Sequence, residues 1–278
     1  MKERLSLFVP VMALILVILC WGLPAQAAEK NLMMATTTST DDTGLLAYLM
    51  PFFEKDTGIS IKWTATGTGK ALKLGENCDV DVLLVHAPAA EKTFVENGFG
   101  VNRRQIMYND FVIIGPENDP AGVKGRSVKD ALTMIRDAKA AFASRGDDSG
   151  THKQEQALWK KSEMPIPDKE SWYIQTGQGM LATINVAEER NAYTMTDRGT
   201  YIKYQDQKGD KGPLKILVEG DKVLLNQYSV IAVDQTRCPK AKYDLAMEFS
   251  NWMAGKKAQE LIKDFKLLGK QLFVPNAE

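Results

Sequence analysis

The chain has 278 residues, of which 35 are basic and 35 acidic, so its formal net charge is zero. This balance argues against nucleic acid as a partner, because proteins that bind nucleic acid present basic surfaces. It also means that an anion bound here must be captured by local donors, because no long-range positive field attracts it.

The N-terminal segment has the layout of a cleavable signal peptide. Residues 1–4 carry a small basic excess, an apolar run follows over residues 5–19, and residues 25–27 read Ala-Gln-Ala. Signal peptidase recognises this small-x-small pattern, so cleavage is expected after Ala27. An uncleaved anchor is disfavoured because the run is shorter than the roughly 20 residues of a membrane span, and lipidation at Cys20 is disfavoured by the bulky Leu19. We expect export to the periplasm.

Two cysteines remain after cleavage, Cys78 and Cys238. In an oxidising compartment they either form a disulfide or stay as two buried thiols, and the sequence leaves both possibilities open. His86 and His152 are the only histidines, so the ligand set for a zinc or iron site is missing and no cofactor is expected.

Short β-rich runs alternate with amphipathic helical stretches from residue 31 onward. The pattern predicts strands at 31–36, 59–64 and 80–86, separated by helices at 44–55 and 69–77. A second series predicts helices at 128–138, 151–161 and 179–189, with strands at 141–144, 172–175 and 192–195. Strands separated by helices are typical of a parallel sheet with helical crossovers, so we expect an α/β fold built from two units.

Two further apolar β-runs, 110–114 and 228–233, flank the second unit and are candidates for strands that cross between two lobes. The last helices, 240–253 and 255–265, are expected to return to the first lobe. We therefore expect residues 28–112 and 228–278 to form one lobe and residues 113–227 the other. The polar stretch 205–213 is expected to be an exposed loop.

Four donor-rich loops follow predicted strands. They are 35–40, with five consecutive hydroxyl residues, 65–70, 144–152 and 175–179. Loops at the carboxyl ends of parallel strands line the ligand crevice of an open sheet, and the helices after them point their positive N-termini into it. Hydroxyl groups and backbone N–H groups at helix starts are suited to an anion.

Several residues of these loops also fit roles that involve no anion. Taken singly, Ser39 and Thr43 are explained as helix N-caps. Residues 67–70 are similar to part of a phosphate loop, but Ala71 stands where a hydroxyl residue is required, so nucleotide binding is not expected. Asp147 and Asp148 have the wrong charge for an oxyanion and are expected to cap the helix and to hold Arg145 or His152.

A hydrolase triad built from Asp148, Ser149 and His152 is not expected, because residues so close in sequence rarely reach one another in the required geometry. The chain is therefore not expected to be an enzyme. A sensor domain would need an attached membrane or signalling segment, so we do not expect this chain to act as a sensor.

Three motifs together resemble one family. Residues 36–39 (Thr-Thr-Thr-Ser), 82–88 (Val-Leu-Leu-Val-His-Ala-Pro) and 144–152 (Ser-Arg-Gly-Asp-Asp-Ser-Gly-Thr-His) are similar to the periplasmic tungstate-binding proteins of tungstate ABC transporters. The resemblance covers the whole mature chain. It implies a type II periplasmic-binding-protein fold, in which two α/β lobes joined by two crossing strands enclose the ligand cleft.

The resemblance also implies the site. Arg145 would be the charged contact, and hydroxyl or amide donors would come from Thr38, Ser39, Thr66, Thr68, Ser149 and Thr151. The expected ligand is tungstate, with molybdate, sulfate or phosphate as alternatives on the same fold. The expected partner is the membrane permease of the transporter, and a monomer is expected by analogy.

Overall fold

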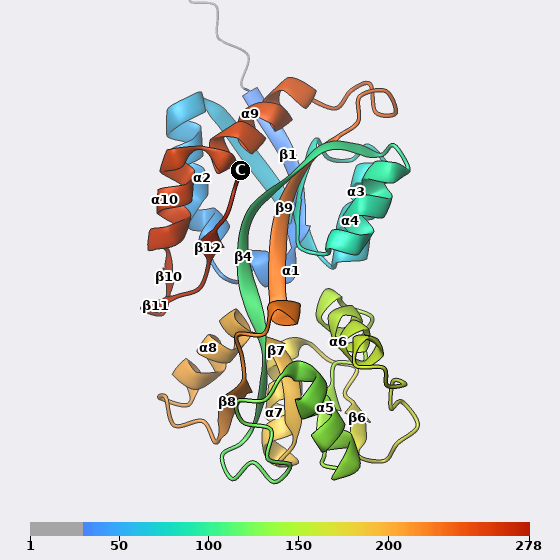
Figure 1. Cartoon of the computed structure of the whole chain (residues 1–278). Helices are drawn as coiled ribbons and strands as arrows, with labels where there is room; N and C mark the ends of the chain where they lie inside the picture. The colour runs from blue at the N-terminus through green and yellow to red at the C-terminus, as the bar shows by residue number, and fades with distance from the viewer. Residues whose placement is uncertain (1–29) are drawn as a thin grey trace, which may run out of the picture.

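The computed structural model describes residues 30–278, so the predicted signal peptide and its cleavage site lie outside the described residues. The chain forms two lobes, one above the other in Figure 1. Lobe 1 is the part built on strands β1 (Lys30–Thr37), β2 (Ile59–Thr66), β3 (Val82–Val85), β9 (Leu225–Val233) and the first part of β4 (Gly100–Pro116). Lobe 2 is the part built on the end of β4 and on β5 (Phe142–Ser144), β6 (Tyr173–Gln175), β7 (Tyr193–Asp197) and β8 (Leu214–Val218).

The sheet of lobe 1 has the strand order β2-β1-β3-β9-β4. Strand β1 runs parallel to β2 and β3, whereas β9 is antiparallel to β3 and β4. Thr37, at the end of β1, is paired with Thr66, at the end of β2, and Thr36 is paired with Leu84 of β3. Three strand ends therefore meet at one edge of this sheet, the edge that faces lobe 2.

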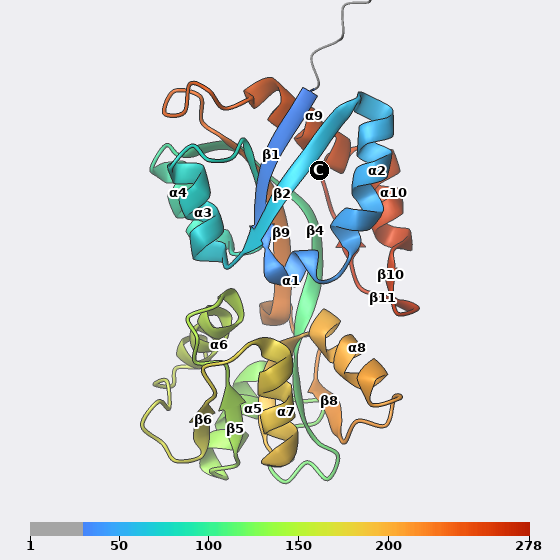
Figure 2. The same ribbon diagram turned by 180° about the vertical axis from the view of Figure 1, so that it is seen from behind.

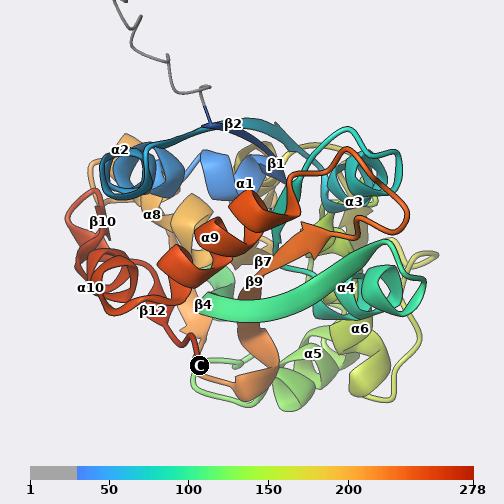
Figure 3. The ribbon, with the colours of Figure 1, turned by 90° about the horizontal axis from the view of Figure 1, so that it is seen from above.

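Helices cover both faces of the lobe 1 sheet, as the view from above shows (Figure 3). Helices α2 (Leu45–Thr57), α9 (Tyr243–Ala254) and α10 (Lys256–Asp264) cover one face, where Phe53 and Phe249 pack with Met34. Helices α3 (Thr68–Glu76) and α4 (Pro88–Glu96) cover the other face, where Phe94 packs with Leu83. The C-terminal helices α9 and α10 thus share a core with α2 and the lobe 1 sheet.

Lobe 2 repeats this layering on a smaller scale. Its strands have the order β4-β7-β5-β6, and β8 pairs with the other side of β4. Its helices are α5 (Val128–Asp137), α6 (Gly150–Lys161), α7 (Met180–Glu189) and α8 (Arg198–Gln207). Trp159, Phe142 and Tyr193 are fully buried in its core.

Two segments connect the lobes. Strand β4 pairs with β9 as far as Asp110 and with β7 from Phe111 onward, so it passes directly from lobe 1 into lobe 2. Arg198, at the start of α8, holds Asp110 at this passage through two hydrogen bonds of 2.6 and 2.5 Å. The chain returns through the short 3-10 helix η1 (Lys222–Leu224), which leads into β9.

Several predicted boundaries need correction. Residues 228–233 are a strand, but they lie wholly within lobe 1, and the chain crosses just before them at Leu224 and Leu225. Helix α4, helix α8 and strand β8 were not predicted. The expected loop at 205–213 is wrong in its first residues, because α8 continues to Gln207.

Cys78 and Cys238 form a disulfide, which decides between the two possibilities that the sequence left open. The bridge joins the end of α3 to the loop after β9, within lobe 1. No helix of residues 30–278 is both long enough and apolar enough to cross a membrane.

Candidate functional site

A cavity of about 440 Å³ lies where the two lobes meet. Figure 2 shows the molecule from the side on which α1 (Thr38–Asp41) of lobe 1 lies above α7 of lobe 2. Thr38 and Ser39 line the cavity from lobe 1, and Arg145 lines it from lobe 2. The structure therefore brings these three predicted residues together around one space.

The short helix α1 presents the two hydroxyl residues of lobe 1. Its N-cap is Thr37, whose hydroxyl accepts the backbone N–H of Thr40 at 3.2 Å. The expectation that Ser39 acts as an N-cap is therefore wrong. Its hydroxyl lies 3.1 Å from the hydroxyl of Thr37 and 3.1 Å from Nε2 of His86, and Ser39 lines the cavity. At the other end of α1, Asp41 accepts a hydrogen bond of 2.8 Å from the indole N–H of Trp63 on β2. Helix α1 is thus held by β2 as well as by β1, the strand that precedes it.

Arg145 follows β5 directly and is held by Asp147. One Nη of Arg145 lies 2.5 Å from a carboxylate oxygen of Asp147, whose other oxygen accepts the N–H of Ser149 at 3.2 Å. Burial acts to raise the pKa of Asp147, but the hydrogen bonds from Ser149 and Arg145 outweigh it and hold this pKa below its usual range. The expectation that an acidic residue positions Arg145 is confirmed for Asp147.

The turn after Arg145 requires glycine. Gly146 has a φ of +60°, and a Cβ atom there would lie 2.8 Å from the Cβ of Gln175. Among the described residues, no acceptor lies within hydrogen-bonding distance of the buried Nε of Arg145. A buried donor without a partner is uncommon in a folded protein, and here it belongs to a side chain that lines the cavity.

The other four predicted donors lie at a different edge of the interface between the lobes. Thr66 ends β2, Thr68 begins α3, Ser149 is the N-cap of α6 and Thr151 lies in its first turn. None of the four lines the cavity. The Oγ1 of Thr68 lies 3.3 Å from the position of a Cβ on Gly150, so the N-termini of α3 and α6 approach each other across the interface.

Ser149 and His152 do not form a nucleophile–base pair. The Ser149 oxygen accepts the backbone N–H of His152 at 3.3 Å, which is an N-cap interaction. Nδ1 of His152 accepts the backbone N–H of Asp148 at 3.1 Å. Both side chains are therefore engaged in shaping the start of α6.

Three charged groups that were not predicted also line the cavity: Asp42, Asp197 and Lys203. The Asp197 carboxylate caps α8 and accepts both the N–H and the hydroxyl of Thr200, at 2.8 and 2.7 Å. Lys203 of lobe 2 donates a hydrogen bond to the backbone oxygen of Asp42 in lobe 1. Asp42 follows α1, Asp197 ends β7 and Lys203 lies within α8, so none of the three stands in one of the four loops that were chosen from the sequence.

His86 was also missed as a site residue, although it could have been found. It comes directly after β3, at the same sheet edge as Thr37 and Thr66. Its Nε2 lies 2.9 Å from the hydroxyl of Thr37 and 3.1 Å from the hydroxyl of Ser39. Its position at a strand end is the same feature that marks the four donor-rich loops.

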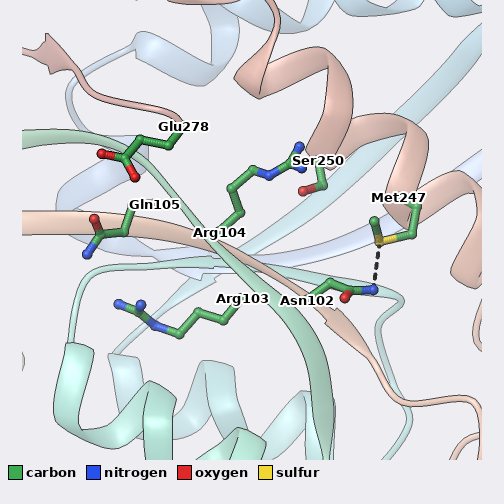
Figure 4. Close-up of a pocket in the computed structure, with 7 residues that line it drawn as sticks. All are labelled: Asn102, Arg103, Arg104, Gln105, Met247, Ser250 and Glu278. Atoms are coloured by element: carbon green, nitrogen blue, oxygen red, sulfur yellow. Dashed lines mark hydrogen bonds between the residues drawn. The ribbon is translucent and has the colours of Figure 1, made fainter.

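A second cavity, of about 460 Å³, lies on lobe 1 and shares no lining residue with the first. Figure 4 shows its lining side chains, which come from residues 102–105 of β4, from Met247 and Ser250 of α9 and from Glu278. Arg104 donates a hydrogen bond of 2.9 Å to the amide oxygen of Asn251 there. This cavity contains none of the predicted anion-binding residues. In residues 30–278 no three His, Cys, Asp or Glu side chains gather as a metal site would require.

Two α/β lobes, two connecting segments and a polar cavity between the lobes define the class of two-lobed solute-binding proteins. The sequence model described as a PBP superfamily domain matches residues 24–257 of this chain. The tungstate-binding protein TupA of Campylobacter jejuni is 50% identical over 240 residues, which cover 86% of this chain and 89% of that protein.

Two solved structures are also similar. The tungstate-binding protein TupA from Desulfovibrio alaskensis G20 is 67% identical, with a TM-score of 0.86, and the match covers 90% of this chain and 100% of that one. The tungstate ABC transporter structure from Geobacter sulfurreducens is 49% identical, with a TM-score of 0.74, over 86% of this chain and 100% of that one. The chain belongs to the PBP superfamily and, within it, to the family of TupA tungstate-binding proteins.

Proposed function

We propose that this protein binds tungstate in the cavity between its lobes and delivers it to the membrane permease of a tungstate ABC transporter. The observation that carries the proposal is the meeting of Thr38 and Ser39 from lobe 1 with Arg145 from lobe 2 around one cavity. The names of the TupA relatives support tungstate as the cargo.

The donor chemistry of these residues suits a fully deprotonated oxyanion. Tungstate is a tetrahedral dianion at neutral pH, so it accepts hydrogen bonds from every side and donates none. Hydrogen phosphate carries a proton and needs an acceptor in its site. The three residues that carry the proposal, Thr38, Ser39 and Arg145, can all donate hydrogen bonds to an oxyanion, and Arg145 cannot accept one. A site of this kind therefore favours tungstate over phosphate.

Closure of the lobes completes the site. Thr66 and Thr68 of lobe 1 and Ser149 and Thr151 of lobe 2 lie where the N-termini of α3 and α6 approach each other, and they add hydroxyl and amide donors as the lobes close over the anion. The motion is a hinge through β4 and through the segment that leads into β9. The units that move are the parts of lobe 1 before Phe111 and from Leu225 onward, and residues 111–224 of lobe 2.

The biological setting follows from the same proposal. The protein is exported by the segment that ends at Ala27, works as a monomer in the periplasm and performs no catalysis. It carries its ligand as cargo and needs no cofactor. Molybdate is the second candidate ligand, because it has the same shape and charge as tungstate, and sulfate or phosphate is the third.

Equilibrium dialysis of the mature chain against tungstate, with metal quantified by mass spectrometry, tests the proposal. We expect one tungstate per chain. Thr38→Val should weaken binding about fivefold, the effect of one neutral hydrogen bond. Thr64→Val is the matched control, because this exposed threonine lies on β2 outside the cavity. Equal binding by both variants would remove Thr38 from the site.

A further inference from the structure

His86 is a half-buried polar group that the proposed anion contacts do not use. Its ring stacks on Tyr228 of β9, with 4.7 Å between ring centroids and 23° between the planes. Both ring nitrogens have partners. Nε2 contacts the anion-binding loop, residues 37–39, and Nδ1 contacts Asn226, next to a segment that connects the lobes. The ring therefore lies between the ligand-facing hydroxyls and the hinge.

On the loop side, Nε2 of His86 lies within hydrogen-bonding distance of two hydroxyls, at 2.9 Å from Thr37 and 3.1 Å from Ser39. A ring nitrogen offers either one lone pair or one hydrogen, so it cannot accept hydrogen bonds from both hydroxyls at full strength. Thr37 is the nearer partner of Nε2 and is 3% exposed, whereas Ser39 lines the cavity. The Thr37 oxygen also lies 2.7 Å from the hydroxyl of Thr40, from which it can accept a hydrogen bond while it donates to His86.

On the hinge side, Nδ1 of His86 lies 2.9 Å from the amide oxygen of Asn226, the second residue of β9. The NH₂ group of Asn226 faces two acceptors, the amide oxygen of Asn109 at 2.7 Å and the Tyr228 hydroxyl at 3.3 Å. Both of its hydrogens are used in this orientation, so the amide oxygen is left to face His86. Nδ1 then carries the ring hydrogen, and Nε2 is an acceptor.

The neutral form of the ring agrees with its surroundings. Burial lowers the pKa of His86, and the hydrogen bond with Asn226 and the charge of Asp197 oppose this effect without reversing it. Asn109 belongs to β4 and is the residue before Asp110, where β4 leaves lobe 1. The chain of hydrogen bonds thus runs from the anion-binding loop through one ring to both segments that connect the lobes.

We propose that His86 is a positioning residue of the anion site, which accepts the hydroxyl hydrogen of Thr37 and leaves the hydroxyl hydrogen of Ser39 free for the oxyanion. This inference rests on the proposed function and extends it to a residue that does not touch the ligand. It explains how two adjacent hydroxyls are given different roles. It also connects the orientation of the loop to Asn226 and Asn109 at the hinge.

The tautomer is tested first, because it can be measured without any ligand. The chain has two histidines, so a long-range ¹H–¹⁵N NMR spectrum is assigned by comparing wild type with His152→Gln. At pH 7 we expect the His86 signals of a protonated Nδ1 and an unprotonated Nε2. A protonated Nε2, alone or in an imidazolium ion, would overturn the proposal.

Matched variants then test the effect on binding. His86→Gln can place an acceptor oxygen near the Nε2 position, His86→Asn reaches only the Nδ1 position, and His86→Phe keeps the stacking on Tyr228 without either nitrogen. We expect about tenfold weaker tungstate binding for the Asn and Phe variants and less than about threefold weaker binding for the Gln variant. Equal affinities of the Gln and Asn variants would overturn the proposal, and this comparison remains valid if the Phe variant fails to fold.

These tests separate the inference from the proposed function. If wild type binds no tungstate, the proposed function fails, while the NMR spectrum still reports the tautomer of His86. If wild type binds tungstate and His86→Asn binds it equally well, the proposed function stands and the positioning role of His86 is rejected.

Discussion

Removal of the Arg145 side chain is the perturbation whose cost the structure predicts in most detail. Arg145 lines the cavity and is paired with Asp147 at 2.5 Å. A charge-assisted hydrogen bond contributes about 1.5–3 kcal/mol, against about 1 kcal/mol for a neutral one. Arg145→Met therefore loses this contribution, and it also leaves the Asp147 carboxylate unpaired beside a dianion.

The second effect can be separated from the first, because the two side chains can be changed together. We expect Arg145→Met to weaken tungstate binding by about 3 kcal/mol or more, which is at least about 100-fold. Arg145→Met/Asp147→Asn should bind more tightly than the single variant, at about 10- to 30-fold weaker than wild type, because the repulsive charge is gone. The amide that replaces the Asp147 carboxylate keeps an oxygen that can accept the N–H of Ser149, so the loop retains its hydrogen bond.

Competition titration against a chromogenic or fluorescent anion probe measures these affinities over the range required. Thr38→Val, expected to lose about 1 kcal/mol, serves as the reference for a neutral donor. The reasoning is refuted if Thr38→Val costs as much as Arg145→Met, or if the double variant binds no more tightly than Arg145→Met.

Three further predictions concern closure and stability. Lys203→Met removes the hydrogen bond to the backbone oxygen of Asp42 across the interface. We expect tungstate to dissociate several-fold faster from this variant in stopped-flow measurements. An unchanged dissociation rate would show that this contact does not hold the lobes closed. Cys78→Ser/Cys238→Ser removes a disulfide between residues 160 positions apart in the chain. We expect the free energy of unfolding to fall by about 2–5 kcal/mol, seen as a lower Tm, with little change in tungstate affinity. An unchanged Tm would contradict this expectation. Burial raises the pKa of Glu155 from 4.5 to about 7 against hydrogen bonds from Tyr173, Ser144 and Trp159, so the folded state holds this proton more tightly than the unfolded state. The resulting stabilisation of the folded state, at most about 3 kcal/mol, is present below pH 4.5 and is lost as pH rises through about 7. The Tm of wild type should therefore fall between these pH values. Glu155→Gln should make Tm depend less on pH.

The alternation of strands and helices was predictable because most elements carry a clear apolar pattern. Helices α4 and α8, which were not predicted, lack a clear apolar pattern. The buried face of α4 contains Phe94 and the charged Glu91, which accepts the N–H of Ala87 at 2.6 Å and pairs with Arg103 at 2.8 Å. The buried face of α8 includes Gln205, whose amide donates to the oxygen of Leu214 at 2.9 Å. Their buried polar residues are satisfied by partners outside the helix, which sequence periodicity does not reveal.

The candidate site was predictable to the level of loops and less so to the level of side chains. Strand ends in a parallel sheet meet at one edge, which is why Thr38 and Arg145 could be chosen from the sequence. Whether a hydroxyl caps a helix or faces the cavity depends on backbone geometry, so Ser39 and Ser149 could not be told apart in this respect. Lys203 was out of reach, because its place at the cavity depends on how the lobes pack.

Binding of tungstate as a fully deprotonated oxyanion in the cavity between the lobes can be measured by isothermal titration. The mature chain is titrated with tungstate, molybdate, sulfate and phosphate in one buffer. We expect tight one-to-one binding of tungstate and weak or absent binding of sulfate and phosphate, and the molybdate titration measures the selectivity between the two metals. Absence of binding heat with all four anions would contradict the account and would direct attention to an organic ligand for the same cavity.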